Sequence, residues 1–215
     1  MIKDKLDQLG LGAAQIIGLG TAFLFITGVS YYYGYYVVGL KADWLINLLT
    51  TKELLISNIR LGAGFILALM FLQEIFFSDS KPKGKQHRTF LIGCGVLIAI
   101  LILLIWRDNR GWLQVLSYLI GLLALFGLMY FKYLGRLISI LLIFFVVPFL
   151  NGYSAYQKKM ASHLPVVSLK DDAKKWYIFD TFSDQVILID SVKKIENIRV
   201  VQVNELENIR VEYSL

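Results

Sequence analysis

Few residues of this chain have both the type and the spacing that chemistry requires. The two histidines, His87 and His163, lie far apart, and neither has a cysteine or carboxylate at the spacing usual for metal ligands. The single cysteine, Cys94, lies in an apolar run, where a thiol stays protonated and inert. The acidic pair Asp171-Asp172 lacks the ligand pattern of a calcium loop. The sequence therefore predicts no metal site.

Motifs for nucleophilic or phosphate chemistry are also missing from the sequence. The chain contains no G-x-S-x-G, H-E-x-x-H, Walker or G-x-G-x-x-G pattern, and the KPKGK segment lacks the glycine spacing of a phosphate loop. We therefore expect a protein that is not an enzyme and that carries no cofactor. Glu74 remains as a candidate intramembrane polar residue, because a carboxylate at mid-bilayer is a functional candidate by default, here for an ion path. The alternative, which we favour, is that Glu74, four residues from Ser78, reaches the headgroups or pairs with Lys81.

The composition predicts a membrane protein. Hydrophobic residues make up 57% of the 215 residues and charged residues 18%, whereas soluble domains have about 45–50% and about 25%. The excess falls in runs long enough to cross a bilayer, for which a helix needs roughly 20 apolar residues. We expect an all-α membrane bundle over residues 1–150, with about five transmembrane helices at about 11–38, 59–77, 89–106, 112–131 and 134–150.

The number of spans depends on residues 112–150. A continuous helix of that length would measure about 58 Å, nearly twice the thickness of the hydrocarbon core. We therefore expect it to fold back at the polar break Lys132–Arg136, where Gly135 relaxes the backbone. The alternative is four spans, with one of the last two runs lying in the interface.

The segment YYYGYY, residues 31–36, closes the first predicted span. Tyrosine and tryptophan prefer the headgroup level, so we interpret these rings as an interfacial belt rather than as a ligand cage, the alternative. The predicted membrane-interface residues are Tyr31, Tyr32, Tyr33, Tyr35, Tyr36, Trp44, Trp106 and Trp112. Residues 43–49 predict a short interfacial elbow helix, and Thr50 and Glu53 have the spacing of a capping box for the next helix. This elbow is either a gate at the headgroups or, as we favour, a plain re-entry turn.

Charge predicts the orientation in the membrane. The net charge of +6 comes from residues 1–150, and the densest basic loop, residues 78–88, argues for the cytoplasmic side. We expect a multi-pass protein of the cell (plasma or inner) membrane, with a cytoplasmic N-terminus and, for five spans, an extracytoplasmic tail. The sequence has no basic stripe interleaved with aromatic residues, so we do not expect it to bind nucleic acid.

Residues 151–215 predict an exit helix and a small β-rich domain. Strand-like runs at 174–182, 185–190, 199–203 and 209–214 predict a four-stranded antiparallel meander. A core of this size is marginal alone, so we expect it to lean on another surface. Trp176, Tyr177 and Phe179 form the candidate partner surface, and the alternative, which we favour, is that they make up the domain's own core.

Two classes of function follow from these expectations. In the first, a non-enzymatic protein acts by protein–protein contact at the membrane, as an immunity protein against a membrane-targeted toxin, a sensor or an assembly factor. Its partners are the lipid bilayer, a protein in or at the membrane and, through small-residue seams in the spans, a second copy of the chain. In the second, the protein is a channel or transporter subunit in which Glu74 shapes the path.

Overall fold

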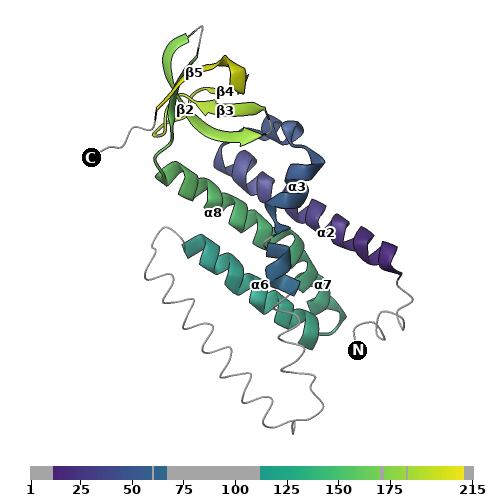
Figure 1. Ribbon diagram of the computed structural model, residues 1–215. Coiled ribbons are helices and arrows are strands. Elements are labelled where there is room, and N and C mark those ends of the chain that lie inside the picture. The colour runs from purple at the N-terminus through teal and green to yellow at the C-terminus, as the bar shows by residue number, and fades with distance from the viewer. Residues whose placement is uncertain (1–11, 60, 67–111, 170–171, 183, 211–215) are drawn as a thin grey trace. The chain divides into compact units, whose positions relative to one another are not determined.

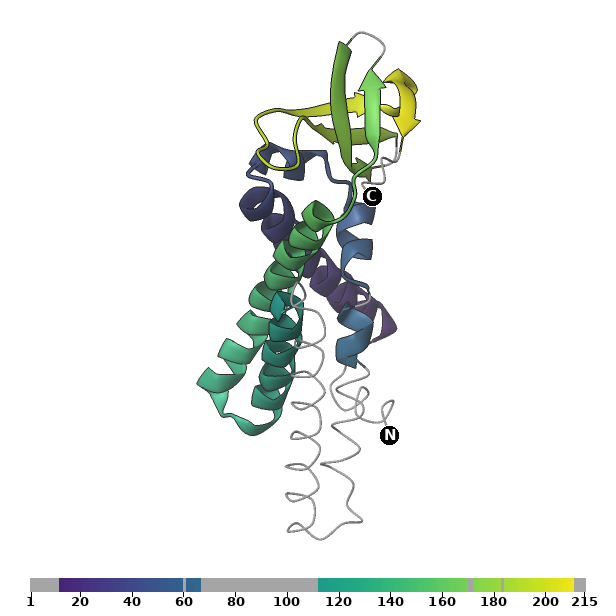
Figure 2. The ribbon, with the colours of Figure 1, turned by 90° about the vertical axis from the view of Figure 1, so that its left-hand side faces the viewer.

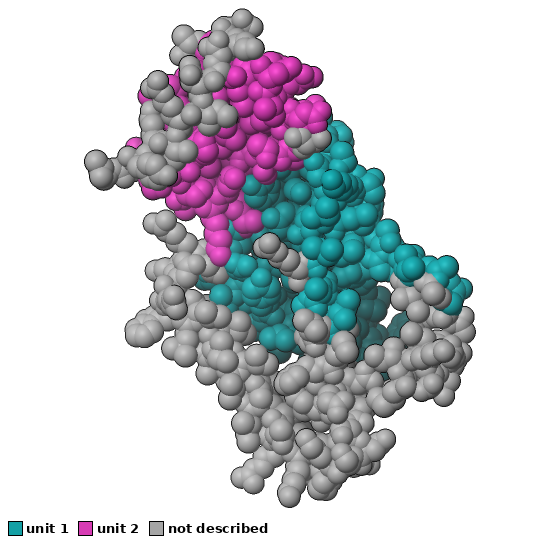
Figure 3. All heavy atoms as spheres, in the orientation of Figure 1, with its two compact units in different colours: residues 1–154 teal, residues 155–215 magenta. Residues whose placement is uncertain are grey.

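The computed structural model describes residues 12–59, 61–66, 112–169, 172–182 and 184–210. The chain divides into two compact units, Met1–Ser154 and Ala155–Leu215, which Figure 3 colours teal and magenta. The first unit is helical in its described part, and the second contains an antiparallel sheet. The sequence places the domain boundary at residue 150, a few residues before this division.

The first helical stretch covers the segment YYYGYY. Helix α2, Ala13–Tyr32, continues directly into the π-helical segment η1, Tyr33–Gly39. A 3-10 helix, η2 (Asp43–Leu48), follows where the sequence predicts the elbow, and α3 comes next, Thr51–Ser57. The predicted capping box of α3 is confirmed, since Thr50 N donates to Glu53 Oε2 at 2.7 Å and Glu53 N donates to Thr50 Oγ1 at 3.3 Å. Residues 61–66 are helical.

The second helical stretch folds back as the sequence predicts. Helix α6, Trp112–Tyr130, ends just before Lys132, and α7, Tyr133–Leu141, packs beside it. Two glycines allow the tight turn, because a Cβ on Gly127 would overlap the Ser139 hydroxyl and a Cβ on Gly135 would overlap the Phe131 ring.

Helix α7 does not end before Pro148. It continues through the π-helical segment η3, Leu142–Val146, into α8, Val147–Ala161. A proline inside an α-helix clashes with the carbonyl four residues earlier, and the wider π turn just before Pro148 relieves that clash. The predicted exit helix is therefore the end of one continuous helix.

Among the described residues, one helix is long and apolar enough to cross a membrane. It runs from Tyr133 to Ala161, and a shorter apolar helix covers Trp112–Leu128. The five-span bundle therefore stays a prediction. The second and third predicted spans lie largely or wholly outside the described residues, as do Glu74 and Trp106.

The antiparallel sheet in the tail is confirmed, but its topology differs from the predicted meander. The strands are β1 (Val166–Leu169), β2 (Asp172–Phe182), β3 (Gln185–Ile189), β4 (Ile198–Gln202) and β5 (Leu206–Arg210). Their order is β4-β3-β2-β1-β5. The prediction missed β1, and β5 pairs with β1 rather than with β4: Val167 stands opposite Ile209. A four-residue strand after Pro165 has too little sequence to show the two-residue period that marks a strand.

This order requires the sheet to curl. In a flat sheet the two outer strands, β4 and β5, would lie roughly 19 Å apart. Yet only the 3-10 turn η4, Val203–Glu205, joins them, and such a turn advances about 2 Å per residue. The sheet is therefore a small, partly open barrel, and in Figure 2 the yellow C-terminal strand runs across the green ones. Its interior holds six buried side chains: Val167, Leu169, Trp176, Val186, Leu188 and Val201.

Candidate functional site

Helix α8 closely crosses the chain where α2 continues into η1. A Cβ on Gly34 would overlap the carbonyl oxygen of Phe149, and a Cβ on Gly152 would overlap the carbonyl oxygen of Tyr31. Each glycine therefore lets the opposite backbone approach to Cα–H···O distance. Gly34 is the glycine inside YYYGYY, so it serves this backbone contact.

Polar contacts fix α2 at this crossing. The hydroxyl of Ser30 donates to the carbonyl oxygen of Phe145 at 2.8 Å, and Phe145 belongs to the π segment η3. A π turn interrupts the regular ladder of helix hydrogen bonds, so a hydroxyl supplied from another helix is a suitable donor there. On the other side of α2, the amide of Asn58 donates to the carbonyl oxygen of Thr27. Both contacts join segments that are distant in sequence.

Four tyrosines form a stacked cluster around Gly34. The rings of Tyr32 and Tyr36 lie nearly parallel with centroids 5.4 Å apart, and those of Tyr31 and Tyr35 are stacked at 6.1 Å. Tyr35 and Tyr36 also meet edge to face at 4.8 Å. Tyr35 and Tyr36 are buried, and Tyr31 and Tyr32 are half-buried.

The predicted interfacial belt thus contains rings in two kinds of environment. Tyr33, Trp44 and Trp112 are exposed, as an interfacial ring requires, whereas Tyr35 and Tyr36 pack inside the structure. Spacing in the sequence did not separate these two sets, because a tandem run places tyrosines all around a helix. The interfacial assignment stays a prediction, and among the described residues the exposed three carry it.

A third polar contact between distant segments joins α6 to α8. The hydroxyl of Ser117 is within 2.9 Å of Asn151 Oδ1 and 2.8 Å of the carbonyl oxygen of Gln114. The side chain of Gln114 reaches the hydroxyl of Tyr118 at 3.0 Å. Ser117 is fully buried. A hydrogen bond between helices at this depth aligns α6 against α8.

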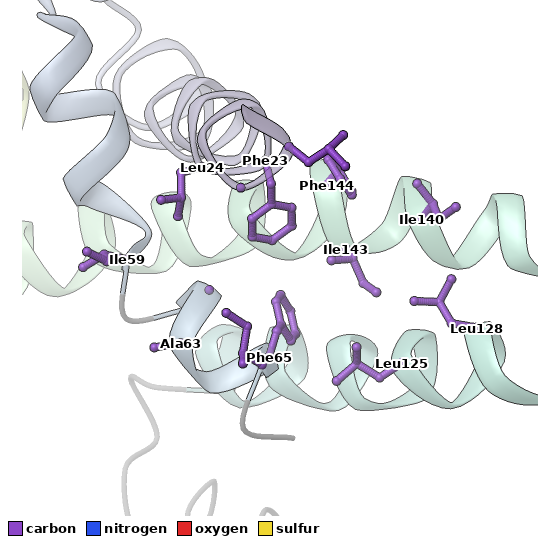
Figure 4. A pocket seen from close by; sticks show the side chains of 14 residues that line it. Phe23, Leu24, Ile59, Ala63, Phe65, Leu125, Leu128, Ile140, Ile143 and Phe144 are labelled. Atoms are coloured by element: carbon purple, nitrogen blue, oxygen red, sulfur yellow. The ribbon is translucent and has the colours of Figure 1, made fainter. Parts of the chain in front are cut away.

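An apolar cavity of about 580 Å³ lies between the helices of this unit (Figure 4). Fourteen of the described residues line it: Leu19, Gly20, Phe23, Leu24, Ile59, Gly62, Ala63, Phe65, Ile66, Leu125, Leu128, Ile140, Ile143 and Phe144. One wall is an edge-to-face pair, Phe23 and Phe144, with ring centroids 4.9 Å apart. This cavity was not predicted from the sequence. The one signal there is the pair of small residues Gly62 and Ala63 in a predicted span, and such a pair is equally typical of a seam where two helices pack closely.

The surface of the barrel unit carries a compact group of charges over Trp176. The indole Nε1 of Trp176 donates to Asp172 Oδ2 at 3.0 Å, and Arg199 Nη1 lies 3.5 Å from the same oxygen. Lys174 Nζ and the Arg199 guanidinium lie 5.2 Å and 5.8 Å from the Trp176 ring centroid, within cation–π range. The Lys174 backbone amide and the Trp176 indole both donate to Asp172 and hold the pKa of that carboxyl below its usual value.

Asp190 organises the loop between β3 and β4. Asn197 Nδ2 donates to Asp190 Oδ2 at 2.8 Å, the Glu196 amide donates to Oδ1 at 3.0 Å, and Lys174 Nζ lies 3.4 Å from Oδ2. Burial of the carboxylate opposes its ionisation, since the side chain is only 7% exposed. These hydrogen bonds outweigh burial and keep the pKa of Asp190 far below its usual value.

We expect Asp190→Asn to lower the thermal unfolding midpoint of the barrel at neutral pH. We also expect this midpoint to change less with pH in the variant than in the wild type. Because the pKa of Asp190 is lower in the folded than in the unfolded chain, its stabilisation is complete above about pH 5. It is lost as pH falls below about 4 toward the folded pKa. Thermal unfolding of both proteins between pH 7 and pH 3 checks this. If the unfolding midpoint fell equally steeply with pH in the wild type and the variant, the prediction would be wrong.

The three residues of the candidate partner surface differ in burial. Trp176 lies in the barrel interior, Phe179 is fully buried with its ring 6.1 Å from that of Tyr156, and Tyr177 is half-buried. Trp176 therefore serves as core, the interpretation that we favour from the sequence. Of the three, Tyr177 alone keeps part of its side chain accessible to another protein.

The described residues include no group of three or more His, Cys, Asp or Glu able to hold a metal ion. His163 is exposed after the end of α8, while His87 and Cys94 lie outside the described part of the chain. Comparison of the chain with protein-family models, with curated proteins and with solved structures finds no match.

Proposed function

We propose that this chain is a multi-pass membrane protein that acts by protein–protein contact, with its C-terminal barrel as the contact module. In this role it performs no chemistry of its own. The membrane part provides residence and orientation, and the barrel provides recognition outside the hydrocarbon core.

The apolar surface of helix Tyr133–Ala161 supports the proposal that this protein lies in a membrane. Only 22% of its most apolar window is buried, whereas the core helix of a soluble protein would be mostly buried. Large apolar side chains stand exposed along α7, Leu134, Leu137, Ile138 and Leu141 among them. Apolar surface of this extent is typical of a helix whose solvent is lipid.

The free edge of β4 supports the proposal that the barrel binds another protein. Among the described strands β4 pairs only with β3, so its other edge presents backbone groups of residues 198–201. The Gln202 amide at the end of this edge donates to Glu205 Oε1 at 3.3 Å. Gln202 and Val203 at the end of this edge are exposed. A partner segment can add to such an edge as a further strand, with hydrogen bonds providing affinity and side-chain pockets specificity. We call residues 198–203 the β4 edge.

The proposed recognition role fits an immunity protein, which neutralises a membrane-targeted toxin by binding it. A sensor or assembly factor would use the same edge. The alternative of a channel or transporter subunit depends on Glu74, which lies outside the described residues, and the described cavity is lined by hydrocarbon.

Photo-crosslinking in native membranes tests the contact. A benzoylphenylalanine at Val203 should give one discrete adduct with a second protein, and the same group at exposed Thr181 on β2 should give little. A gene for a membrane-active toxin beside this one, and protection of cells from that toxin, would identify the partner. No adduct at either position, together with ion flux from protein-containing liposomes, would favour conduction instead.

A further inference from the structure

We propose that the cavity of the helical unit binds one acyl chain of an anionic phospholipid, whose phosphate is held by Lys132 and Arg136. The inference rests on the membrane residence proposed above and goes beyond it, because it assigns a lipid site inside the bundle. It requires three properties of the site: a hydrocarbon lining, an entrance from the bilayer and a cation near the entrance.

The lining selects for hydrocarbon. None of the fourteen lining residues carries a polar side chain. A ligand with hydrogen-bonding groups would lose its hydration there without compensation, which excludes sugars, nucleotides and ions. The volume of about 580 Å³ lies within the roughly 300–1,000 Å³ of sites that hold small molecules.

The lining residues divide by their exposure into a rim of exposed side chains and a floor of buried ones. Leu19 is 62% exposed, and Ile59, Ile66 and Ile140 are also exposed, so these side chains form an apolar rim. Leu125 at 1% exposure and the buried Ile143 form the floor (Figure 4). Because the rim is apolar, a chain from the surrounding bilayer enters without crossing a polar barrier.

The two cations lie at the start of α7, before the rim residue Ile140. Arg136 precedes Ile140 by four residues on α7, so these two lie on one helix face about 6 Å apart along the axis. Lys132 is the N-cap residue of α7, and its carbonyl oxygen accepts from the Arg136 amide at 3.1 Å, so it lies one turn before Arg136. Both cationic side chains are exposed and long enough to reach the headgroup level while their stems stay in the apolar zone. A phosphate beside the entrance complements their charge, and an acyl chain attached to it points into the cavity.

Two glycines of α2 provide a matched pair of variants. Gly20 lines the cavity and Gly18 does not, yet both are exposed and a Cβ on either meets no atom within 4 Å. Gly20→Phe should fill the cavity without disturbing the bundle, and Gly18→Phe should add the same ring outside the cavity. Lys132→Gln combined with Arg136→Gln removes the cations, with Lys52→Gln on α3 as its control.

The full chain is placed in phosphatidylcholine vesicles with a trace of phosphatidylglycerol that carries a photoreactive diazirine near the end of one acyl chain. Labelled residues are then located by mass spectrometry. We expect labels on floor residues Leu125 and Ile143, reduced about tenfold by Gly20→Phe and unchanged by Gly18→Phe. A tenfold loss is what removal of roughly two buried methylene groups produces. The double glutamine variant should reduce floor labelling by this probe more than by a phosphatidylcholine probe.

The outcomes separate this inference from the proposed function. Labels on exposed Leu134 and Leu137 without labels on the floor would overturn the lipid site and leave membrane residence intact. Floor labelling unaffected by Gly20→Phe would also overturn it. No labelling at any apolar residue would contradict membrane residence itself. If Gly20→Phe does not fold, labelling of Leu125 and Ile143 in the wild type still tests the lipid site, because the absence of these labels would overturn it.

Discussion

Gly152→Ala should lower the free energy of unfolding of the helical unit by about 3 kcal/mol, the upper end of overpacking penalties. The added Cβ would overlap the carbonyl oxygen of Tyr31, a backbone atom that cannot rotate away. The helices therefore have to separate at the crossing. Separation would also lengthen the contact between the Ser30 hydroxyl and the Phe145 carbonyl, which is now 2.8 Å. Gly34→Ala should have a similar effect, because its Cβ would overlap the Phe149 carbonyl.

Gly18→Ala is the matched control for this prediction. It adds the same methyl group to a helix at an exposed position with no atom within 4 Å of the new Cβ. It should be neutral or stabilise by up to about 1 kcal/mol through helix propensity. Unfolding in mixed detergent micelles, followed by circular dichroism, measures both. Equal stabilities of Gly152→Ala and Gly18→Ala would show that the close crossing is wrong.

Trp176→Ala should unfold the barrel while the helical unit keeps its helices. Truncation of a buried tryptophan costs about 3–5 kcal/mol, which is as much as a core of this size usually provides. The indole also holds Asp172 through its Nε1 at 3.0 Å and lies under Lys174 and Arg199. Hydrogen exchange of β3 and β4 amides should accelerate strongly, and exchange in α6 should not change.

Trp176→Phe separates packing from hydrogen bonding. It retains most of the buried ring and loses the donor to Asp172, so we expect a loss of about 1 kcal/mol. Thr181→Ala on the exposed part of β2 should stay within about 0.5 kcal/mol of wild type. If Trp176→Ala instead leaves exchange unchanged and abolishes partner binding, the indole is a partner surface and its placement in the core is wrong.

The sequence predicted those features of the fold that depend on local chemistry. Hydroxyl and carboxylate three residues apart predicted the capping box at Thr50 and Glu53, since each group bonds backbone within one helical turn. The 39-residue apolar run had to fold back, and the structure places its break at Lys132. The antiparallel hairpin of β2 and β3 followed from β-branched residues on both sides of a short turn.

What the sequence missed depends on contacts between distant segments. The pairing of β5 with β1 joins residues about forty positions apart, and no local pattern specifies it. The burial of Tyr35 and Tyr36 is set by tertiary packing, and a tandem run of tyrosines does not show which rings face inward. The cavity needs four helical segments at once, so its lining reads in sequence as ordinary apolar residues.

Membrane residence of α7 is the claim on which the other proposals depend, and a depth measurement tests it directly. A spin label at exposed Ile138 is compared, in phospholipid vesicles, with one at exposed Thr181 of the barrel, after Cys94→Ser removes the native thiol. We expect the Ile138 label to collide frequently with oxygen and rarely with a water-soluble nickel chelate, and the Thr181 label to show the reverse. Equal access of the nickel chelate to both labels would contradict it.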